Sequence, residues 1–250
     1  MRKKVFLISC VLACSMHAVA QDETSSCSSV TLDGSAYDFI FYWKRNATQA
    51  HWTGLGFAFS DLEGLSGVDL KPTQSYSIML NVSDFIIPMH PHWLFFTGVG
   101  LDFSRYHFRG NVGLKGIPAT DGSGRYVAAF VPDPAHEYKS SKLLTYYVTI
   151  PFMLEYQTRT AKNNLFFING GVEGLIGYYT KSQVDIRNGD QVEKVSLGRD
   201  LGQRPLSGRL ALRAGFRQWS LFGYYQLFSL FKDGKGPDVR PCGMGVMLNF

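Results

Sequence analysis

Long apolar runs, charge of one sign and a helical repeat are all scarce in this chain of 250 residues. After residue 20, no stretch reaches the roughly 18 consecutive apolar residues that a membrane-spanning helix needs. Lys and Arg number 25 against 20 Asp and Glu, and three of the cations lie together at Arg2, Lys3 and Lys4. The rest of the sequence is close to neutral, which excludes nucleic-acid binding through a concentrated basic face.

Cysteine is also sparse, and the sequence has no Cys and His spacing typical of a zinc site. Cys10 and Cys14 fall in a predicted leader. Cys27 and Cys242 lie far apart in the sequence, so we expect two unpaired thiols. There is no glycine-rich phosphate loop between a strand and a helix. We therefore expect neither a metal nor a cofactor.

Residues 1–20 have the three parts of a secretory signal peptide. Arg2 to Lys4 are basic, Val5 to Ala13 are apolar, and Ala18 to Ala20 form a small-residue cleavage site. An alternative is a lipoprotein leader with Val11 to Cys14 as the acylation box. Both interpretations predict an exported protein.

From about residue 51 to the C-terminus, apolar and polar residues alternate with a period of two, which is typical of strands with one apolar face. Residues 21–50 lack this sustained pattern, and we predict that they form a periplasmic or interfacial arm. Eight segments are expected to be strands: about 51–60, 75–84, 93–105, 143–156, 165–180, 206–217, 219–231 and 243–250.

The links between these segments alternate between short and long, a pattern typical of outer-membrane barrels. The links at about 85–92 and 157–164 are short, whereas those at 109–140 and 182–205 are long. The sequence is 14% aromatic and contains 26 Gly, many on the polar faces, which suits a narrow lumen. We predict an all-β fold for 51–250: an eight-stranded antiparallel transmembrane β-barrel of the outer-membrane type, rather than a soluble sandwich.

Two local features refine this prediction. Asn188-Gly189 lies between two alternating stretches, and this dipeptide favours a hairpin turn that extends the strands as a ribbon. Pro151 lacks the N–H that a ladder hydrogen bond needs, so we expect a bulge there.

The polar faces of the predicted strands carry both signs of charge. Counted from the periplasmic ends, Glu173 and Arg209 lie level, Asp102 lies at the height of Glu173, and Asn169 faces Arg213. Glu155 and Arg217 fall near the periplasmic mouth. The predicted lumen network is Asp102, Glu155, Glu173, Arg209, Arg213 and Arg217. Since eight strands enclose space for side chains only, we favour a structural plug of ion pairs over a selectivity filter or proton path.

Cations also gather near the outer strand ends, where they could contact lipopolysaccharide phosphates or simply form a solvated rim. The candidates are Lys139, Lys142, Lys181, Lys232, Lys235 and Arg240. At the other end, the terminal Phe250 on an apolar face resembles the signal that barrel-assembly machinery binds.

The sequence contains two pairs of residues that could be catalytic, but neither makes a convincing site. Ser104 with His107, and His136 with Glu137, lie near the predicted outer rim, where barrel enzymes that modify lipids place Ser and His. A nucleophile needs a base and an orienting acid in contact with it, and the sequence shows residue types only. The turn Asp121 to Gly124 lacks the further carboxylates of a calcium site. We therefore predict no catalytic residue and no metal ligand.

Several strings resemble the PorT-like outer-membrane β-barrel family of the Bacteroidota over roughly 37–250. They are His51-Trp52-Thr53-Gly54, Thr97 to Asp102, Tyr106 to Asn111, Lys142-Leu143-Leu144, Pro151 to Tyr156, Gly170 to Gly174 and Leu230 to Pro237. The resemblance implies an eight-stranded barrel in the outer membrane. Most of that family has no assigned function, and one branch assists type IX secretion.

The function expected from the sequence is that of a non-enzymatic outer-membrane barrel with a binding, envelope-organising or secretion-accessory role. Its partners would be outer-membrane lipid, lipopolysaccharide, and a protein at the outer loops or the N-terminal arm. The alternatives are a narrow channel for small solutes and a lipid-modifying enzyme.

Overall fold

The computed structural model describes residues 50–90, 92–119, 125–159, 165–188 and 191–250. The predicted signal peptide (1–20) and the predicted arm (21–50), apart from Ala50, lie outside the described residues, as does the turn Asp121 to Gly124. Ala50–Phe250 form one compact unit. In the part of the chain that is described, no helix is both long and apolar enough to cross a bilayer.

The described unit is built from strands. They are β1 (Gly54–Glu63), β2 (Tyr76–His90), β3 (Trp93–Phe108), β4 (Val112–Pro118), β5 (Tyr126–Pro132), β6 (Tyr138–Arg159), β7 (Leu165–Asn188), β8 (Gln191–Arg199), β9 (Leu206–Phe216), β10 (Trp219–Gln226) and β11 (Arg240–Asn249).

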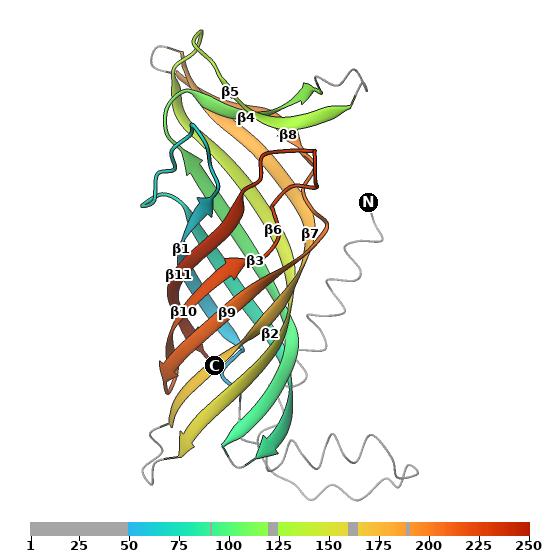
Figure 1. The fold of residues 1–250 in the computed structure, drawn as a ribbon. Coiled ribbons are helices and arrows are strands. Elements are labelled where there is room, and N and C mark those ends of the chain that lie inside the picture. The colour runs from blue at the N-terminus through green and yellow to red at the C-terminus, as the bar shows by residue number, and fades with distance from the viewer. Residues whose placement is uncertain (1–49, 91, 120–124, 160–164, 189–190) are drawn as a thin grey trace, which may run out of the picture. The chain divides into compact units, whose positions relative to one another are not determined.

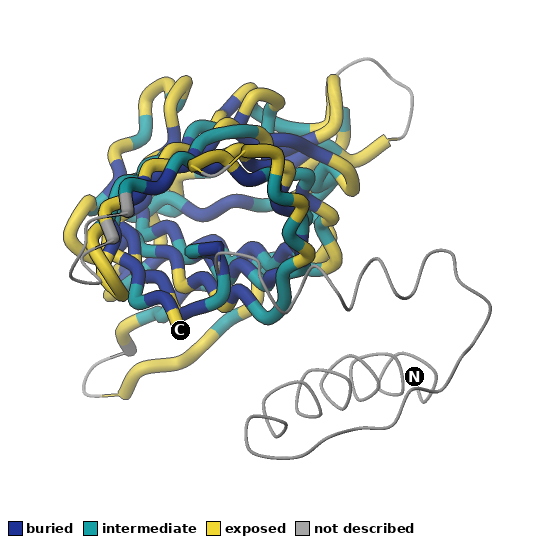
Figure 2. The backbone as a smooth tube through the Cα atoms, turned by 90° about the horizontal axis from the view of Figure 1, so that it is seen from below, coloured by how far each residue is buried: buried dark blue, intermediate teal, exposed yellow. Residues whose placement is uncertain are grey.

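Most of these strands belong to one antiparallel sheet that closes into a ring (Figure 1; Figure 2 looks along its axis). Around the ring the order is β6-β3-β2-β1-β11-β10-β9-β7, and β7 pairs with β6 to close it. The remaining strands come from the two longest links: β4 and β5 form a separate two-stranded sheet, and β8 pairs with the upper part of β7. The described residues thus form eleven strands instead of the predicted eight, because the long links form hairpins of their own.

Side chains alternate across the wall of the ring, as the period-two pattern predicts. Along β1, buried and exposed residues alternate from Gly54 to Glu63. On β9, Leu210 and Leu212 are exposed, whereas Arg209 and Arg213 are buried. In this part of the wall the leucines therefore face outward, and the arginines are enclosed.

Several strands run further than the sequence indicated. β2 continues to His90 and β3 starts at Trp93, so most of the predicted link 85–92 is strand. β10 is shorter than predicted and ends at Gln226. Asn188 pairs with Gln191, so β7 and β8 form the predicted ribbon, and the two residues between this pair lie outside the described residues.

The bulge expected at Pro151 is wrong. The β3–β6 ladder keeps the same register on both sides of Pro151, but Ile150 and Pro151 have no partner in that ladder. Pro151 does pair with Glu173 on the other side. The ladder accommodates the missing N–H by an interruption on one side, which costs less distortion than an inserted residue. Register shifts fall elsewhere, for example between Asn81 and Ser83.

Candidate functional site

The middle of the lumen holds a buried network of ion pairs. Glu173 on β7 accepts a hydrogen bond from Arg209 Nε at 2.5 Å through Oε2 and one from Arg213 Nη2 at 2.8 Å through Oε1. Arg209 also donates through Nη1 to Asp102 on β3, across the ring. Glu173 and Arg209 are cross-strand neighbours, as the count of residues from the strand ends predicted. Two guanidiniums and two carboxylates thus tie β3, β7 and β9 together.

Aromatic rings and thioethers surround the two guanidiniums. The guanidinium carbon of Arg213 lies 4.2 Å from the centre of the Trp52 ring, and that of Arg209 lies 4.8 Å from the Tyr224 ring. Arg213 Nη1 lies 3.3 Å from the sulfur of Met247. Arg213 and Trp52 are almost completely buried, with 1% and 0% of their surface exposed. Because these groups are buried, a charged side chain without a partner here would lower the free energy of unfolding by several kcal/mol, on the order of 3–5.

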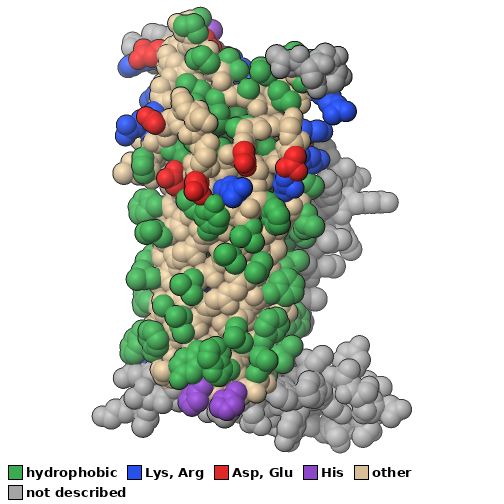
Figure 3. Space-filling model, viewed as in Figure 1, with side chains coloured by type: hydrophobic (Ala, Val, Ile, Leu, Met, Phe, Trp, Pro, Cys, Tyr) green, Lys and Arg blue, Asp and Glu red, His purple; other side chains and the backbone are tan. Residues whose placement is uncertain are grey.

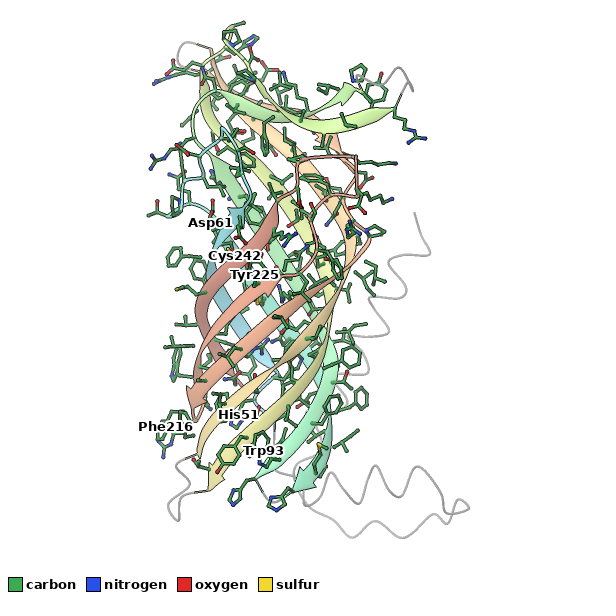
Figure 4. The ribbon with its side chains drawn as sticks, in the orientation of Figure 1. His51, Asp61, Trp93, Phe216, Tyr225 and Cys242 are labelled. Carbon is green, nitrogen blue, oxygen red and sulfur yellow. The ribbon has the colours of Figure 1, made fainter. Side chains whose placement is uncertain are left out.

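A second cluster surrounds Glu155 nearer the end of the ring where β1 begins. Its carboxylate accepts hydrogen bonds from Asn169 Nδ2 at 2.9 Å, from Gln157 Nε2 at 2.5 Å and from the backbone N–H of His51 at 3.2 Å. The Nδ1 atom of His51 lies 2.8 Å from Glu155 Oε1. The His51 ring, labelled in Figure 4, also stacks on Phe167 at 3.8 Å. These contacts hold His51, in the segment before β1, inside the ring.

Hydroxyl groups continue the network on the other side of the ion pairs. Ser104 Oγ donates to Asp102 Oδ1 at 2.8 Å and lies 2.6 Å from Ser77 Oγ. Ser60 Oγ lies 2.6 Å from Ser77 Oγ and 2.8 Å from the Tyr224 hydroxyl. Chains of such bonds strengthen one another in a medium of low dielectric constant. Asp102 therefore has hydrogen-bond donors from both β9 and β3.

An apolar cluster occupies the opposite end of the lumen from His51. Leu230, Phe231 and Val239, in the connection after β10, are buried against Tyr106 and Phe108 of β3. Leu230 and Val239 each have no exposed surface. Side chains therefore fill the described lumen at three levels: the Glu155 cluster, the ion-pair network and this apolar cluster.

The charge balance of the enclosed groups is uneven. Asp102, Glu155 and Glu173 are buried carboxylates, while Arg209 and Arg213 are the buried guanidiniums of the network. The third carboxylate, Glu155, has the His51 ring as its neighbour, with Nδ1 2.8 Å from Oε1. This pairing replaces the one expected between Glu155 and Arg217.

Arg217 does not lie in the lumen, so its assignment to the network is wrong. Phe216 pairs with Trp219, which leaves Arg217 and Gln218 as the connecting turn. Arg217 has a positive φ of 54°, which ends the inward and outward alternation of β9 at Phe216. The predicted strand ran one residue further, to Arg217. Its side chain is exposed, and its guanidinium carbon lies 5.8 Å from the Phe216 ring.

Lys142 differs from the other predicted rim cations. It is only 6% exposed, and its Nζ donates to Asp185 Oδ2 at 3.0 Å. Because neighbouring strands cover this ion pair, Lys142 is no longer available as a contact for lipopolysaccharide. The structure leaves Lys139, Lys232, Lys235 and Arg240 exposed and Lys181 half-buried.

The considered catalytic pairs are not assembled. Ser104 is buried on the lumen side of β3, where it contacts Asp102, whereas His107 faces the outer side of the same strand. The His107 ring contacts Ser140 instead, whose Oγ lies 3.4 Å from Nδ1. His136 is exposed and lies 3.2 Å from Asp133. Among the described residues, no group of three or more His, Cys, Asp or Glu could hold a metal ion.

His51 and Trp52 are the lumen residues that the sequence did not reveal. The strand predicted at about 51–60 includes both positions, but β1 begins at Gly54, and alternation alone does not show which side chains they contact. No signal for them was present in the sequence, because the predicted network balanced three carboxylates with three guanidiniums, and the surplus carboxylate at Glu155 appears only once Arg217 is placed in the turn.

Comparisons with protein-family models, with curated proteins and with solved structures find no match for this chain.

Proposed function

We propose that this chain is an outer-membrane β-barrel protein without enzymatic activity, whose lumen is closed by side chains and whose loop end binds a partner. The role would be in binding, envelope organisation or secretion. The observation that carries this proposal is the inside-out distribution of polarity: Arg213 and Glu173 are buried, while Leu206, Leu212 and Leu221 are each more than half exposed. Such an arrangement is unfavourable in water and favourable in lipid.

The apolar exterior forms a band with two borders (Figure 3). On β7, the outward residues from Phe166 to Tyr178 are all uncharged. Strand residues over that length, tilted as in known barrels, rise about 30 Å, close to the thickness of a bilayer's hydrocarbon core. Charged side chains lie beyond the Tyr178 level, and this boundary supports a membrane-embedded segment below it.

Aromatic side chains mark both borders, as the interfaces of a bilayer favour. At the end where the chain terminates lie Trp93, Phe216, Trp219 and Phe250. Trp93 and Phe216 are labelled there in Figure 4. At the other border, the Tyr146 ring contacts those of Phe103 and Tyr178. By analogy with bacterial barrels, the first end faces the periplasm and the loops face outward.

The filled lumen supports a structural plug. The ion-pair network, the Glu155 cluster and the apolar cluster around Phe231 each occupy the cross-section, and a ring of eight strands leaves little further space. The alternative is a narrow channel. Steady single-channel openings of the purified protein in planar bilayers would favour the channel. A bilayer with the same protein density that shows no channel current would support the plug.

The positions of Ser104 and His107 weigh against the lipid-modifying alternative. Ser104 and His107 lie on opposite sides of the wall, so they cannot exchange a proton directly. The lipid-modifying alternative requires a changed lipid A in cells that carry the protein. Identical lipid A from wild-type, Ser104→Ala and His107→Ala strains supports our proposal.

The loop end offers surfaces for a partner. The β4–β5 hairpin exposes Tyr126 (70%) and Ile117 (36%), and the β7–β8 ribbon exposes Val192 (43%). Lys139, Lys232 and Lys235 are available there for lipopolysaccharide phosphates. A pull-down that loses its protein partner when residues 112–132 are deleted would identify the hairpin as the docking element.

Three further elements of the proposal come from the sequence. Residues 1–20 act as a cleaved signal peptide, the chain is related to PorT-like barrels, and the strand ending at Phe250 is bound by barrel-assembly machinery. At that end, the Phe250 N–H donates to Thr53 O at 2.9 Å, so the last residue is joined to the entry of β1. Deletion of Phe250 should therefore lower the assembled fraction in the outer membrane.

The central test is fractionation of cells that express the full chain. We expect the mature protein in the outer-membrane fraction, resistant to extraction at alkaline pH, soluble only with detergent, and shifted in gel migration by boiling. A monodisperse protein in detergent-free buffer would overturn the proposal, because the exposed band would then lie in water.

A further inference from the structure

A row of outward-facing residues on the loop side of the apolar band is the strongest feature that the proposed function leaves unused. It consists of cross-strand neighbours on five strands: Tyr76 of β2, Arg105 of β3, Leu144 of β6, Lys181 of β7 and Arg199 of β8. Neighbouring strands lie about 4.8 Å apart, so the backbones of Arg105 and Lys181, one on each side of Leu144, are about 10 Å apart. Two side chains of this length can converge on one group placed over Leu144.

Aromatic side chains lie next to this row, at the border of the band. The Tyr146 ring contacts those of Phe103 and Tyr179, with 5.4 Å between the ring centres in each case. Each of the three lies two residues along its own strand from a member of the row. Because such aromatic rings lie at the level of lipid head groups, the row is placed where head-group charges of the outer leaflet would lie.

This side of the ring has an excess of positive charge. Asp185 accepts a hydrogen bond from Lys142 Nζ at 3.0 Å, so its carboxylate is already engaged. Burial, and then the charges of Arg105, Lys142 and Lys71, lower the pKa of His107 from 6.5 to about 4. The row itself contains no carboxylate, and its cations are therefore left for an external anion.

The two ends of the row differ in what they offer such an anion. Arg105 Nη1 donates to the Tyr76 hydroxyl at 3.0 Å, a neutral partner that leaves the charge of the guanidinium uncompensated. Arg199 is followed directly by Asp200, so we do not count it in the site. The binding groups are therefore the guanidinium on β3 and the ammonium of Lys181 on β7.

The opposite side of the ring has the reverse charge balance. β6 and β11 are separated by three strands in either direction around the ring. Near β11, Asp61 and Glu63 of β1 and Asp238 accompany a single cation, Arg240, which is the cross-strand partner of Glu63. An anion at this border is thus attracted to the side formed by β3, β6 and β7 and repelled from the side formed by β1 and β11.

We propose that the surface between Arg105 and Lys181 binds lipopolysaccharide, with one phosphate of its lipid A over Leu144 and an acyl chain over Tyr146 and Val148. The inference deepens the proposed function and rests on it, because the loop end must lie in the leaflet that holds lipopolysaccharide. A phosphate has several acceptor oxygens, so it can bind a guanidinium and an ammonium at the same time. Tyr146 and Val148 are the next outward positions of β6, and burial of the chain against them adds affinity.

The test uses the full chain in detergent, stripped of co-purified lipid, with bound lipid counted by native mass spectrometry in the absence of divalent cations. Phosphorylated lipid A, the same lipid A after phosphatase treatment, and phosphatidylglycerol are added singly at matched concentrations. We expect one molecule of phosphorylated lipid A to bind with a Kd about tenfold below that of the dephosphorylated form, and added salt to weaken this binding. Phosphatidylglycerol should bind more weakly, because it has fewer acyl chains to bury. Equal or tighter binding of phosphatidylglycerol or of dephosphorylated lipid A overturns the proposal.

Substitutions at Leu144 separate the effect of charge from that of shape. Leu144→Glu places a carboxylate between the two cations, where the phosphate would bind, and should weaken binding of phosphorylated lipid A by at least about tenfold. Leu144→Gln is the matched control, with a side chain of the same size and no charge, and should change the Kd by no more than about twofold. Equal effects of the two substitutions overturn the placement of the phosphate.

Substitutions of the cations test the binding groups themselves. Arg105→Gln and Lys181→Gln should each weaken binding about tenfold, whereas Lys181→Arg keeps the charge and should retain it. Arg217→Gln removes an exposed cation at the other border and should leave binding unchanged. The gel shift on boiling confirms that each variant is folded. A folded, detergent-requiring barrel whose lipid A binding ignores Arg105 and Lys181 sinks this site alone, whereas a water-soluble protein sinks the proposed function.

Discussion

Glu173 and Arg213 form a hydrogen-bonded ion pair, 2.8 Å between Oε1 and Nη2, in which each side chain is only 1% exposed. The second carboxylate oxygen of Glu173 binds Arg209. One carboxylate therefore bridges two guanidiniums that project from the same strand, four residues apart, and Asp102 supplies the second negative charge. Loss of Glu173 would leave Arg213 without its anionic partner, whereas Arg209 would retain Asp102.

The first prediction follows from this geometry. Glu173→Gln should lower the free energy of unfolding by about 3–5 kcal/mol, since it leaves Arg213 buried without its anionic partner. The measurement is urea unfolding of the barrel refolded into phosphatidylcholine vesicles. Arg217→Gln, an exposed turn residue, is the control and should change the value by no more than about 0.5 kcal/mol.

A second substitution tests the cause of that loss. Adding Arg213→Met to Glu173→Gln should recover part of the lost stability, because the buried charge without a partner is removed and apolar volume is kept. If the double variant is less stable than the sum of the single effects predicts, the unpaired charge of Arg213 is not the source of the destabilisation, and the account of the network is wrong.

The second prediction concerns the segment before β1. Glu155→Ala removes the acceptor for the His51 backbone N–H and for Asn169, so residues 50–53 should exchange their amide hydrogens faster. Hydrogen exchange followed by mass spectrometry measures this directly. Glu193→Ala on β8, an exposed position, is the matched control and should leave these amides protected. Unchanged exchange in Glu155→Ala would show that Trp52 packing alone holds the segment.

The third prediction is a pH dependence at His107, which lies beyond the Tyr146 border of the band. Burial, and then the charges of Arg105, Lys142 and Lys71, lower the pKa of His107 from 6.5 to about 4. The unfolded chain therefore takes up a proton at a higher pH than the folded protein does. The folded state loses stability as the pH falls from about 6.5 to about 4, and the loss is complete below the folded pKa.

The His107 prediction can be checked in two ways. An NMR titration should place the folded pKa of His107 near 4, and Lys142→Gln should raise it by removal of a cation. In unfolding experiments at pH 7, 5.5 and 4, the free energy of unfolding should fall less with pH in His107→Gln than in the wild type. A His107 that titrates at its ordinary value would contradict the burial and charge that the structure assigns to it.

The alternation of residue types was enough to predict the ring and the central ion pairs. Glu173 and Arg209 could be matched because every second residue of a strand faces inward and neighbouring strands share a level. The same rule failed at Arg217, since the positive φ of a turn residue ends the alternation. It also failed at Lys142, whose burial depends on coverage by neighbouring strands, which period two does not encode.

The strand total and the loop hairpins were harder to predict for a different reason. β4, β5 and β8 lie in links outside the closed ring, and these strands are short and lack a clean inward and outward pattern. Trp52 and His51 contribute to the lumen from outside any strand. Their positions follow from tertiary packing on Arg213 and Glu155, which a local pattern does not contain.

The last prediction separates a lipid environment from a water environment by position on one strand. Leu212 and Leu206 both point outward on β9, with 59% and 69% of their surface exposed. Leu212 lies in the middle of the band, whereas Leu206 pairs with Ile176 near its upper border. In a bilayer, Leu212→Arg should cost about 2–4 kcal/mol of unfolding free energy and Leu206→Arg about 0–1 kcal/mol, because the cost of a charge falls towards the interface. Around a water-exposed wall, both substitutions would be nearly neutral, within about 0.5 kcal/mol. Unfolding of both variants in the same vesicles gives the difference directly, and equal small effects would place this wall in water.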